Sequence, residues 1–264
     1  MKIKLKHTLS LFILSFGTLL GMMFYYDLDW SLLTSLSFYE DIANPSVKVV
    51  KIGAGLRKEE IADYLTKRFA WNEKQKEEFL NAHLAYFTES FEGKYFPKTY
   101  LIHKDSDPVV VSKTMTDEYR RKVNSIKKPK STNIINPDLA LIVASLIQRE
   151  SGGKSDMRLI SGIIWNRIFK GMKLQIDATL QYAKGDEDLW WPPVIPEDKK
   201  IDSPFNTYIY AMPPTPIANP GADALNAAYN PQKTGCLFYL HDKYRKIHCS
   251  STYQGHLNNI KRYL

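Results

Sequence analysis

One acidic residue, Glu150, follows a strongly apolar stretch, residues 140–147, and precedes a dense set of polar and aromatic side chains. A carboxyl group held against an apolar wall keeps its proton at neutral pH, as a general acid must. With hydrogen-bonding groups nearby, such an acid suits sugar chemistry, in which it protonates the leaving oxygen. The candidate substrate-binding residues that follow are Asn166, Arg167, Gln175, Asp177, Thr179 and Tyr182.

The local pattern predicts that Glu150 lies in the last turn of a buried helix. Asn136 can cap its start, Pro137 suits its first turn, and Asp138 lies near the positive end of the helix dipole. The helix is expected to end at about Ser151, before two glycines. The negative helix end and the apolar surroundings both raise a carboxyl pKa. Taken alone, the segment fits a surface glutamate at a frayed helix end equally well.

Two further segments supply polar groups that could surround the acid. A helix expected over residues 156–170 carries Asn166 and Arg167 near its C-terminal end. Gln175 and Asp177 have alternate spacing, so they point the same way if their segment is extended. If it is helical, Asp177 caps a short helix instead. The turn-forming sequence SPFNTYIY adds two candidate substrate contacts, Asn206 and Tyr208.

The N-terminal sequence predicts a single-pass membrane anchor. Three lysines, Lys2, Lys4 and Lys6, precede an uncharged stretch of 19 residues, 8–26. A helix that spans a bilayer needs roughly 17–25 residues. Positive charge before the stretch and acids after it predict that the N-terminus stays in the cytoplasm and that the residues after about 30 lie outside it. A cleaved signal peptide is the alternative, although no small-residue cleavage site follows the stretch.

The net charge of +8 is compatible with nucleic acid, anionic lipid or an anionic polymer as partner, and it selects none of them. The densest basic stretch, residues 120–130, lacks interleaved aromatic residues and any nucleic-acid-binding motif. A solvated surface is therefore expected there, without a nucleic-acid partner. The sequence contains neither a metal-ligand cluster nor a phosphate-binding loop, so no metal and no cofactor are expected.

The two cysteines fit an oxidising compartment. Cys236 and Cys249 bracket a stretch that reads as a β-hairpin, and paired strands could bring the two thiols together as a disulfide. Two unpaired buried thiols are the alternative. A zinc site that adds His241 and His248 would require unusual ligand spacing.

The expected order of elements predicts an α+β fold. The cytoplasmic tip and anchor take residues 1–30. A small module of two strands and two helices, with a connecting helix, takes residues 45–130. A polar, proline-containing boundary follows. The second module, residues 131–264, carries the candidate site.

Five segments, taken in order, resemble the endolytic murein lytic transglycosylases, the MltG or YceG-like proteins. FEGKYFPKTY, residues 91–100, also resembles an upstream signature of that family. The resemblance covers about residues 45–264. The five segments are ASLIQRES (144–151), NRIFKGMKLQIDATLQY (166–182), SPFNTY (203–208), MPPTPIANPGADAL (212–225), and LFYLHD (237–242) with His248 further on.

The resemblance implies an inner-membrane anchor, a LysM-like domain, and a catalytic domain that cuts peptidoglycan glycan strands internally. It implies that Glu150 is the catalytic residue, because Glu150 takes the place of the second acid in the family's E-K-E-T pattern. In the implied mechanism, Glu150 protonates the oxygen between N-acetylmuramic acid and N-acetylglucosamine. It then accepts the proton of the muramic C6 hydroxyl, which closes on C1 to leave a 1,6-anhydro end. Association with cell-wall synthases is a further implication.

The chain departs from the family pattern at several positions. Gln148 replaces the first acid of E-K-E-T, which leaves Glu150 as the acid of that pattern, and Ser151 replaces its threonine. Ala178 replaces the proline of D-P-T, and the two cysteines are not part of the pattern.

Two other functions fit the same residues. The first is a muramidase hydrolase, with Glu150 as acid and Asp177 as base. The second is a membrane-tethered scaffold that binds peptidoglycan without cutting it.

Overall fold

The computed structural model describes residues 21, 40, 43–86, 90–129 and 135–264. The chain divides into two compact units, residues 1–53 with 97–107 and residues 54–96 with 108–264. The described elements are helices and two separate antiparallel pairs of strands. The predicted α+β class is therefore confirmed.

The predicted anchor, residues 8–26, lies outside the described residues apart from Gly21, and so do the three lysines that precede it. Among the residues that are described, no helix combines the length and the apolar composition that crossing a membrane requires.

In the first unit, strand β1 (Val47–Lys51) pairs with strand β2 (Thr99–His103) in an antiparallel ladder. The register sets Val47 opposite His103 and Lys51 opposite Thr99. Three valines in β1 favour the extended backbone. Two α-helices and a short 3-10 helix separate the described strands along the chain, in keeping with the order strand, helix, helix, strand that the sequence predicts.

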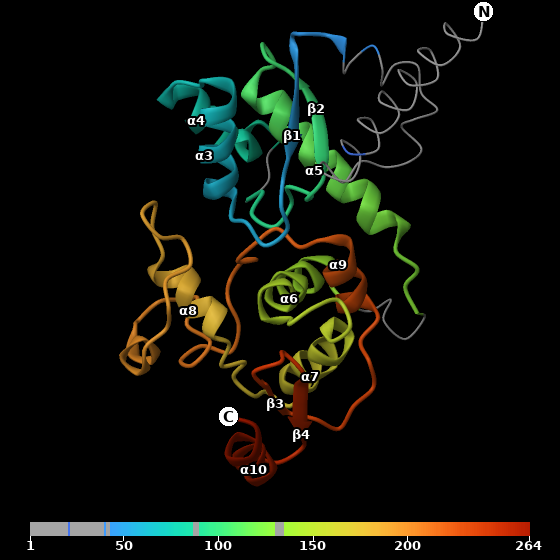
Figure 1. The fold of residues 1–264 in the computed structure, drawn as a ribbon, viewed down its shortest axis with the longest axis vertical. Helices are drawn as coiled ribbons and strands as arrows, with labels where there is room; N and C mark the ends of the chain where they lie inside the picture. The colour runs from blue at the N-terminus through green and yellow to red at the C-terminus, as the bar shows by residue number, and fades with distance from the viewer. Residues whose placement is uncertain (1–20, 22–39, 41–42, 87–89, 130–134) are drawn as a thin grey trace, which may run out of the picture. The chain divides into compact units, whose positions relative to one another are not determined.

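The second unit contains the remaining elements, whose order Figure 1 shows by colour. Its N-terminal elements are α3 (Lys58–Phe69), α4 (Glu73–Leu80), the 3-10 helix η2 (Ala82–Tyr86) and α5 (Pro108–Ser125). Its later elements are α6 (Pro137–Glu150), α7 (Met157–Phe169), α8 (Asp177–Lys184), the 3-10 helix η4 (Pro196–Lys200), α9 (Ala222–Tyr229), strands β3 (Phe238–His241) and β4 (Ile247–Ser250), and α10 (Tyr253–Tyr263).

Helix α6 is the centre of the larger hydrophobic core. It packs against α7, α8 and α9, and Figure 1 shows it nearly end-on between α7 and α9. Its side chains Val143, Leu146 and Ile147 are fully buried. The side chain of Asn136 caps its start by accepting hydrogen bonds from the backbone N–H groups of Asp138 and Leu139, at 2.8 and 3.3 Å. A capped and buried helix thus fixes the position of Glu150, its last residue.

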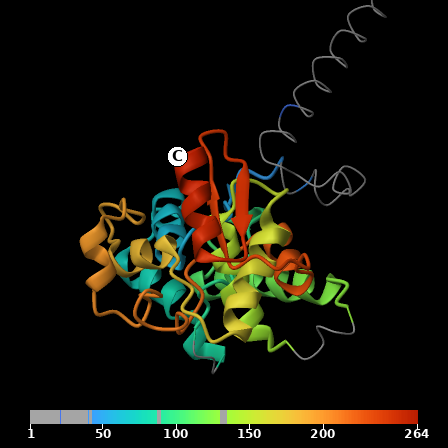
Figure 2. The ribbon, with the colours of Figure 1, turned by 90° about the horizontal axis from the view of Figure 1, so that it is seen from below.

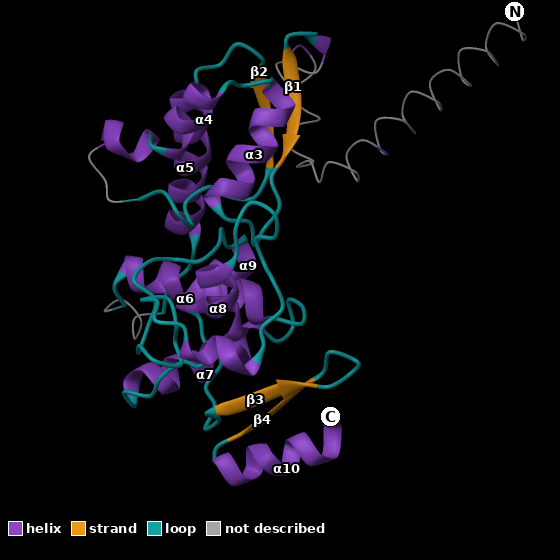
Figure 3. Ribbon diagram, turned by 90° about the vertical axis from the view of Figure 1, so that its left-hand side faces the viewer, coloured by secondary structure: helices purple, strands orange, loops and turns teal. Residues whose placement is uncertain are grey.

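The C-terminal part of this unit is a short hairpin covered by a helix. Strands β3 and β4 pair in antiparallel fashion, with Tyr239 opposite Cys249. Helix α10 packs on both strands, as Figures 2 and 3 show. The hydroxyl of Thr252 caps α10 by accepting a hydrogen bond from the N–H of Gly255, at 3.1 Å.

Candidate active site

Glu150 lies in a cleft of about 440 Å³ within the second unit. The cleft wall comes from the end of α6, the segment before α8, strand β3 and helix α10. The sequence-predicted site residues on this wall are Glu150, Arg167, Gln175, Asp177 and Tyr208.

The carboxyl group of Glu150 is closely surrounded by protein atoms, and the resulting desolvation raises its pKa above the ordinary value. The negative charge of Asp177 acts in the same direction. Hydrogen bonds from Tyr239 and from the N–H of Ala178, and the charge of His241, oppose the rise. Desolvation is the largest of these effects, so the environment favours the protonated acid.

Tyr239 holds one oxygen of this acid. Its hydroxyl donates a hydrogen bond to Oε2 of Glu150, at 2.6 Å. Burial and then the charge of Glu150 raise the pKa of Tyr239 well above its ordinary value, so the phenol keeps its proton. Because Oε2 accepts this bond, the acid proton is favoured on the other oxygen, Oε1.

Asp177 and Gln175 lie on the same side of the segment that leads into α8. Both are exposed in the cleft, and they alternate with the buried Leu174 and Ile176. Asp177 is the first residue of α8 and makes no cap; its Oδ1 accepts a hydrogen bond from the hydroxyl of Tyr208, at 2.6 Å. Gln175 has a φ of 52°, in the left-handed region that non-glycine residues rarely adopt.

Arg167 lines the cleft, but its guanidinium donates hydrogen bonds to backbone carbonyls. Its Nε donates to the carbonyl of Leu237 and its Nη1 to that of Leu174, both at 2.6 Å. The neighbouring Asn166 donates to the carbonyls of Thr234 and Cys236, at 2.8 and 3.1 Å. The end of α7 therefore fastens the strand that carries Tyr239.

Four of the sequence-predicted contacts lie outside the cleft lining: Asn166, Thr179, Tyr182 and Asn206. Thr179 and Asn206 are fully buried. The hydroxyl of Thr179 donates to the carbonyl of Ile176, and the amide of Asn206 donates to that of Ile201. These polar groups shape the loops around the cleft and do not reach into it.

The residues that β3 and α10 bring to the cleft were not predicted from the sequence. His241 contacts Oδ2 of Asp156 through its Nε2, at 2.8 Å, and the same oxygen accepts the N–H of Gly152. This contact ties the glycine turn after α6 to β3. The one available sequence signal was LFYLHD, whose alternate residues share a strand face. The missed lining residues are Phe238, Tyr239, Leu240, His241, Tyr253, His256, Ile260 and Leu264.

The sulfur atoms of Cys236 and Cys249 lie at bonding distance, and the two Cα atoms are 5.8 Å apart. The disulfide closes a loop with a sequence separation of 13 residues. It therefore links β4 to the segment just before β3, the strand that carries Tyr239.

Replacing both cysteines with serine is expected to lower the free energy of unfolding by about 3 kcal/mol, because closing a loop of this size restricts the unfolded chain. Denaturant unfolding without reductant measures the loss. Wild-type protein treated with reductant should match the double variant, whereas reductant should not affect the variant. A wild-type midpoint that does not respond to reductant would contradict the prediction.

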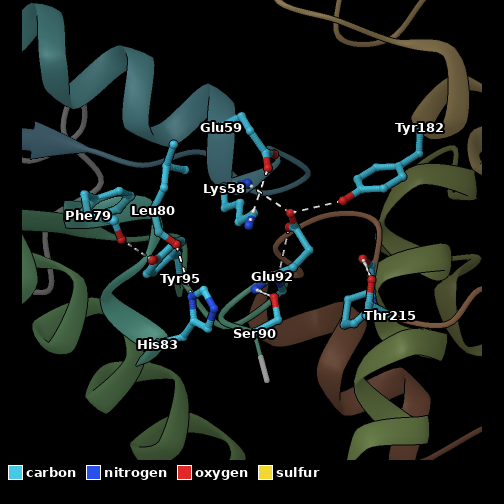
Figure 4. Close-up of polar contacts among 12 residues, drawn as sticks. Lys58, Glu59, Phe79, Leu80, His83, Ser90, Glu92, Tyr95, Tyr182 and Thr215 are labelled. Carbon is cyan, nitrogen blue, oxygen red and sulfur yellow. Dashed lines mark hydrogen bonds and ion pairs between the residues drawn. The ribbon is translucent and has the colours of Figure 1, made fainter. Parts of the chain in front are cut away.

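A second buried acid, Glu92, lies outside the cleft lining (Figure 4). Its carboxyl accepts hydrogen bonds from the N–H groups of Lys58 and Gly93, at 3.3 and 3.1 Å, and from the hydroxyl of Tyr182, at 3.4 Å. Desolvation, followed by the charge of Glu59, raises the pKa of Glu92 to about 8. Glu92 thus links the start of α3 to α8.

The YceG-like family model matches residues 25–262. A relative named endolytic murein transglycosylase, from Bacillus subtilis (strain 168), is 33% identical over 175 residues, which are 66% of this chain and 48% of the relative. A relative of the same name from Streptococcus pneumoniae (strain D39) is 29% identical over 182 residues, 66% of this chain and 32% of the relative. The chain thus spans about half or less of the length of these curated relatives.

The fold is also similar to a crystal structure of a YceG-like protein from Listeria monocytogenes. The TM-score is 0.66 with 24% sequence identity, over 82% of this chain and 76% of that chain. The family match extends over nearly the whole sequence and includes the elements described above, apart from the last residue of α10. The chain therefore belongs to the YceG-like family.

Proposed function

We propose that this protein is an endolytic peptidoglycan lytic transglycosylase. It cuts bonds between N-acetylmuramic acid and N-acetylglucosamine within nascent glycan strands, leaves 1,6-anhydro ends, and so terminates strand elongation. The observation that carries the proposal is the desolvated carboxyl of Glu150, which lines the cleft and is held by Tyr239. The names of the two relatives support the same reaction.

In the proposed reaction, Glu150 acts twice. Its protonated carboxyl first donates to the glycosidic oxygen as the bond to C1 of the muramic residue breaks. The resulting carboxylate then accepts the proton of the C6 hydroxyl, and the hydroxyl oxygen bonds to C1. One carboxyl group is sufficient, because the proton that it gives to the leaving sugar is replaced by the proton of the C6 hydroxyl. No water is consumed.

The hydrolase alternative differs in its use of Asp177. A two-carboxylate hydrolase needs a second acid to activate water or to attack the sugar. Asp177 lines the same cleft as Glu150, and its negative charge raises the pKa of Glu150. In the lytic reaction, Asp177 instead accepts the hydrogen bond of Tyr208 and helps to keep Glu150 protonated.

The test is digestion of purified peptidoglycan sacculi, followed by mass analysis of the fragments. Lytic cleavage leaves anhydro ends that are lighter by one water molecule than hydrolysed ends. Endolytic action releases long fragments first, whereas an exolytic enzyme releases disaccharides from the start. Reducing ends without anhydro ends would exclude the lytic reaction, and no cleavage at all would favour the scaffold.

A Tyr239→Phe variant is expected to lose about 10- to 100-fold in kcat/KM, since a hydrogen bond to a charged group contributes about 1.5–3 kcal/mol. The hydroxyl of Tyr239 lowers the pKa of Glu150, so its removal raises that pKa further. The alkaline limb of the pH–rate profile should therefore move to higher pH.

The matched control is Tyr208→Phe, which removes a hydroxyl from the same cleft but from Asp177 rather than Glu150. Its alkaline limb should stay near the wild-type position. A Tyr239→Phe limb that coincides with the wild type would contradict the role given to this hydroxyl.

The rest of the architecture follows the same proposal. Residues 1–30 form a cytoplasmic tip and a single-pass anchor in the inner membrane, residues 45–130 form a LysM-like and connecting module, and residues 131–264 form the catalytic domain outside the cytoplasm. This places Glu150 beside the cell wall and near cell-wall synthases as partners. A C-terminally fused reporter that works only outside the cytoplasm should be active, and should lose activity when residues 1–30 are deleted.

A further inference from the structure

Helix α10 contributes an aromatic side chain to the cleft, and this side chain has no role in the proposed reaction. Tyr253 lines the same cleft as Glu150, and 61% of its surface is exposed. The other two tyrosines of the lining are engaged with acids: the hydroxyl of Tyr239 binds Glu150, and that of Tyr208 binds Asp177. Tyr253 therefore presents an exposed aromatic surface in the cleft that Glu150 also lines.

The ring of Tyr253 is supported by two other rings. Its centroid lies 5.8 Å from that of Phe238 and 6.4 Å from that of His256. Phe238 and His256 stack on each other at 5.6 Å with an interplanar angle of 24°. The guanidinium of Arg167 lies 5.1 Å from the Phe238 centroid. The three rings form a packed cluster whose exposed member is Tyr253.

The imidazole of His256 fits this cluster as a neutral ring. Desolvation, and then the positive charge of Arg167, lower the pKa of His256. A neutral imidazole packs on Phe238 without the cost of burying a charge. Tyr253 also begins α10, whose first turn is capped by Thr252. The contacts with the rings of Phe238 and His256, together with the capped start of the helix, reduce the freedom of the Tyr253 ring before any ligand binds.

We propose that Tyr253, backed by Phe238 and His256, is a stacking platform for one N-acetylhexosamine ring of the glycan strand. The proposal rests on the proposed function and names a sugar subsite of the same cleft. The C–H groups on one face of a pyranose ring form an apolar surface, which a flat aromatic side chain covers while its hydroxyl stays in water. The cleft volume of about 440 Å³ lies within the range of small-ligand sites, roughly 300–1,000 Å³.

An endolytic enzyme must hold a strand away from its ends, so it needs contacts with sugars other than the one that reacts. A stacking contact binds the ground state and the transition state alike. Tyr253 is therefore expected to act on binding and KM, whereas Glu150 acts on kcat.

The test uses the full chain and uncross-linked glycan strands as the probe. Binding is measured in the Glu150→Gln background, where strands are not cut, and cleavage is measured with Glu150 intact. Tyr253→Ala and Tyr253→Leu are expected to raise Kd and KM about tenfold, which corresponds to about 1.4 kcal/mol, with kcat within about twofold of wild type. Tyr253→Trp keeps a flat ring and should bind as wild type does.

The matched control is Tyr244→Ala. Tyr244 lies in the turn between β3 and β4, is 79% exposed, and is outside the cleft lining. Its replacement should change neither Kd nor KM. Unfolding midpoints of all variants check that the fold is retained.

The outcomes separate the platform from the proposed function. If the wild type cuts the strands and Tyr253→Ala binds them equally well, the platform is overturned and the proposed function stands. If the wild type neither binds nor cuts them, the proposed function fails and the platform fails with it. A loss confined to kcat would also overturn the platform.

Discussion

Replacing Glu150 with glutamine is expected to abolish glycan cleavage, with a loss of at least about 10³-fold in kcat. General acid–base catalysis contributes about 10²–10⁴-fold at a single step. In the proposed reaction the same carboxyl donates the first proton and accepts the second, so the loss should lie in the upper part of that range. The amide has the shape of the acid and still accepts the Tyr239 hydrogen bond, so the fold should persist.

The measurement is the rate of appearance of anhydro ends from sacculi, with glycan binding followed in parallel. Binding should remain near wild type, because the amide retains the size of the acid. The informative control is Asp177→Asn. The lytic reaction predicts a much smaller loss for Asp177→Asn than for Glu150→Gln, whereas a two-carboxylate hydrolase predicts losses of similar size. Unchanged cleavage by Glu150→Gln would remove Glu150 as the acid.

The position of Glu150 was predictable because the signals that fix it are local. A cap, a proline, an apolar run and a pair of glycines define helix α6 between Asn136 and Ser151. The same kind of signal located α7 and the hairpin. These elements depend on neighbours in sequence, and the structure places the expected ends of α6 and α7 within about two residues.

The partners of Glu150 were not predictable in this way. The hydroxyl of Tyr239 comes from a residue 89 positions away in the sequence, and the contact exists only because the hairpin packs beside the end of α6. The polar residues that follow the acid in the sequence show the same limit: Thr179 and Asn206 were expected as ligand contacts, yet they donate hydrogen bonds to backbone carbonyls. The sequence does not distinguish a side-chain donor that binds a ligand from one that binds a backbone carbonyl.

Glu92 shows the same limit for a buried acid. The segment FEGKYFPKTY contributed to the family resemblance, but nothing in its pattern indicates that this carboxyl is only 2% exposed. Its burial depends on α3 and α8, which meet it through Lys58 and Tyr182 (Figure 4).

A Glu92→Gln variant is expected to have a flatter dependence of stability on pH than the wild type. Burial raises the pKa of Glu92 to about 8 in the folded protein, against an ordinary value of 4.5. Between these two pH values, the folded state holds a proton that the unfolded state has lost. The contribution of Glu92 is fully present below about pH 4.5 and is lost as the pH rises through about 8.

The size of the effect follows from the same linkage. Each pH unit within that window lowers the free energy of unfolding by up to about 1.4 kcal/mol for one proton. Glutamine has no proton to lose, so the variant should gain stability relative to the wild type from pH 5 to pH 8. At pH 5 it should be the less stable protein, because its amide nitrogen meets an N–H donor of Lys58 or Gly93.

Denaturant unfolding at pH 5, 6, 7 and 8 measures the difference between variant and wild type, in which the contributions of Glu150 and the other titrating groups cancel. Asp117→Asn is the control, since it removes one partly exposed carboxylate, ion-paired with Lys113 and Arg120, from α5 of the same unit. Its difference from wild type should vary little over this range. Parallel pH curves for Glu92→Gln and the wild type would show that Glu92 gives up its proton without cost to the fold, and that a charged carboxylate is accommodated between α3 and α8.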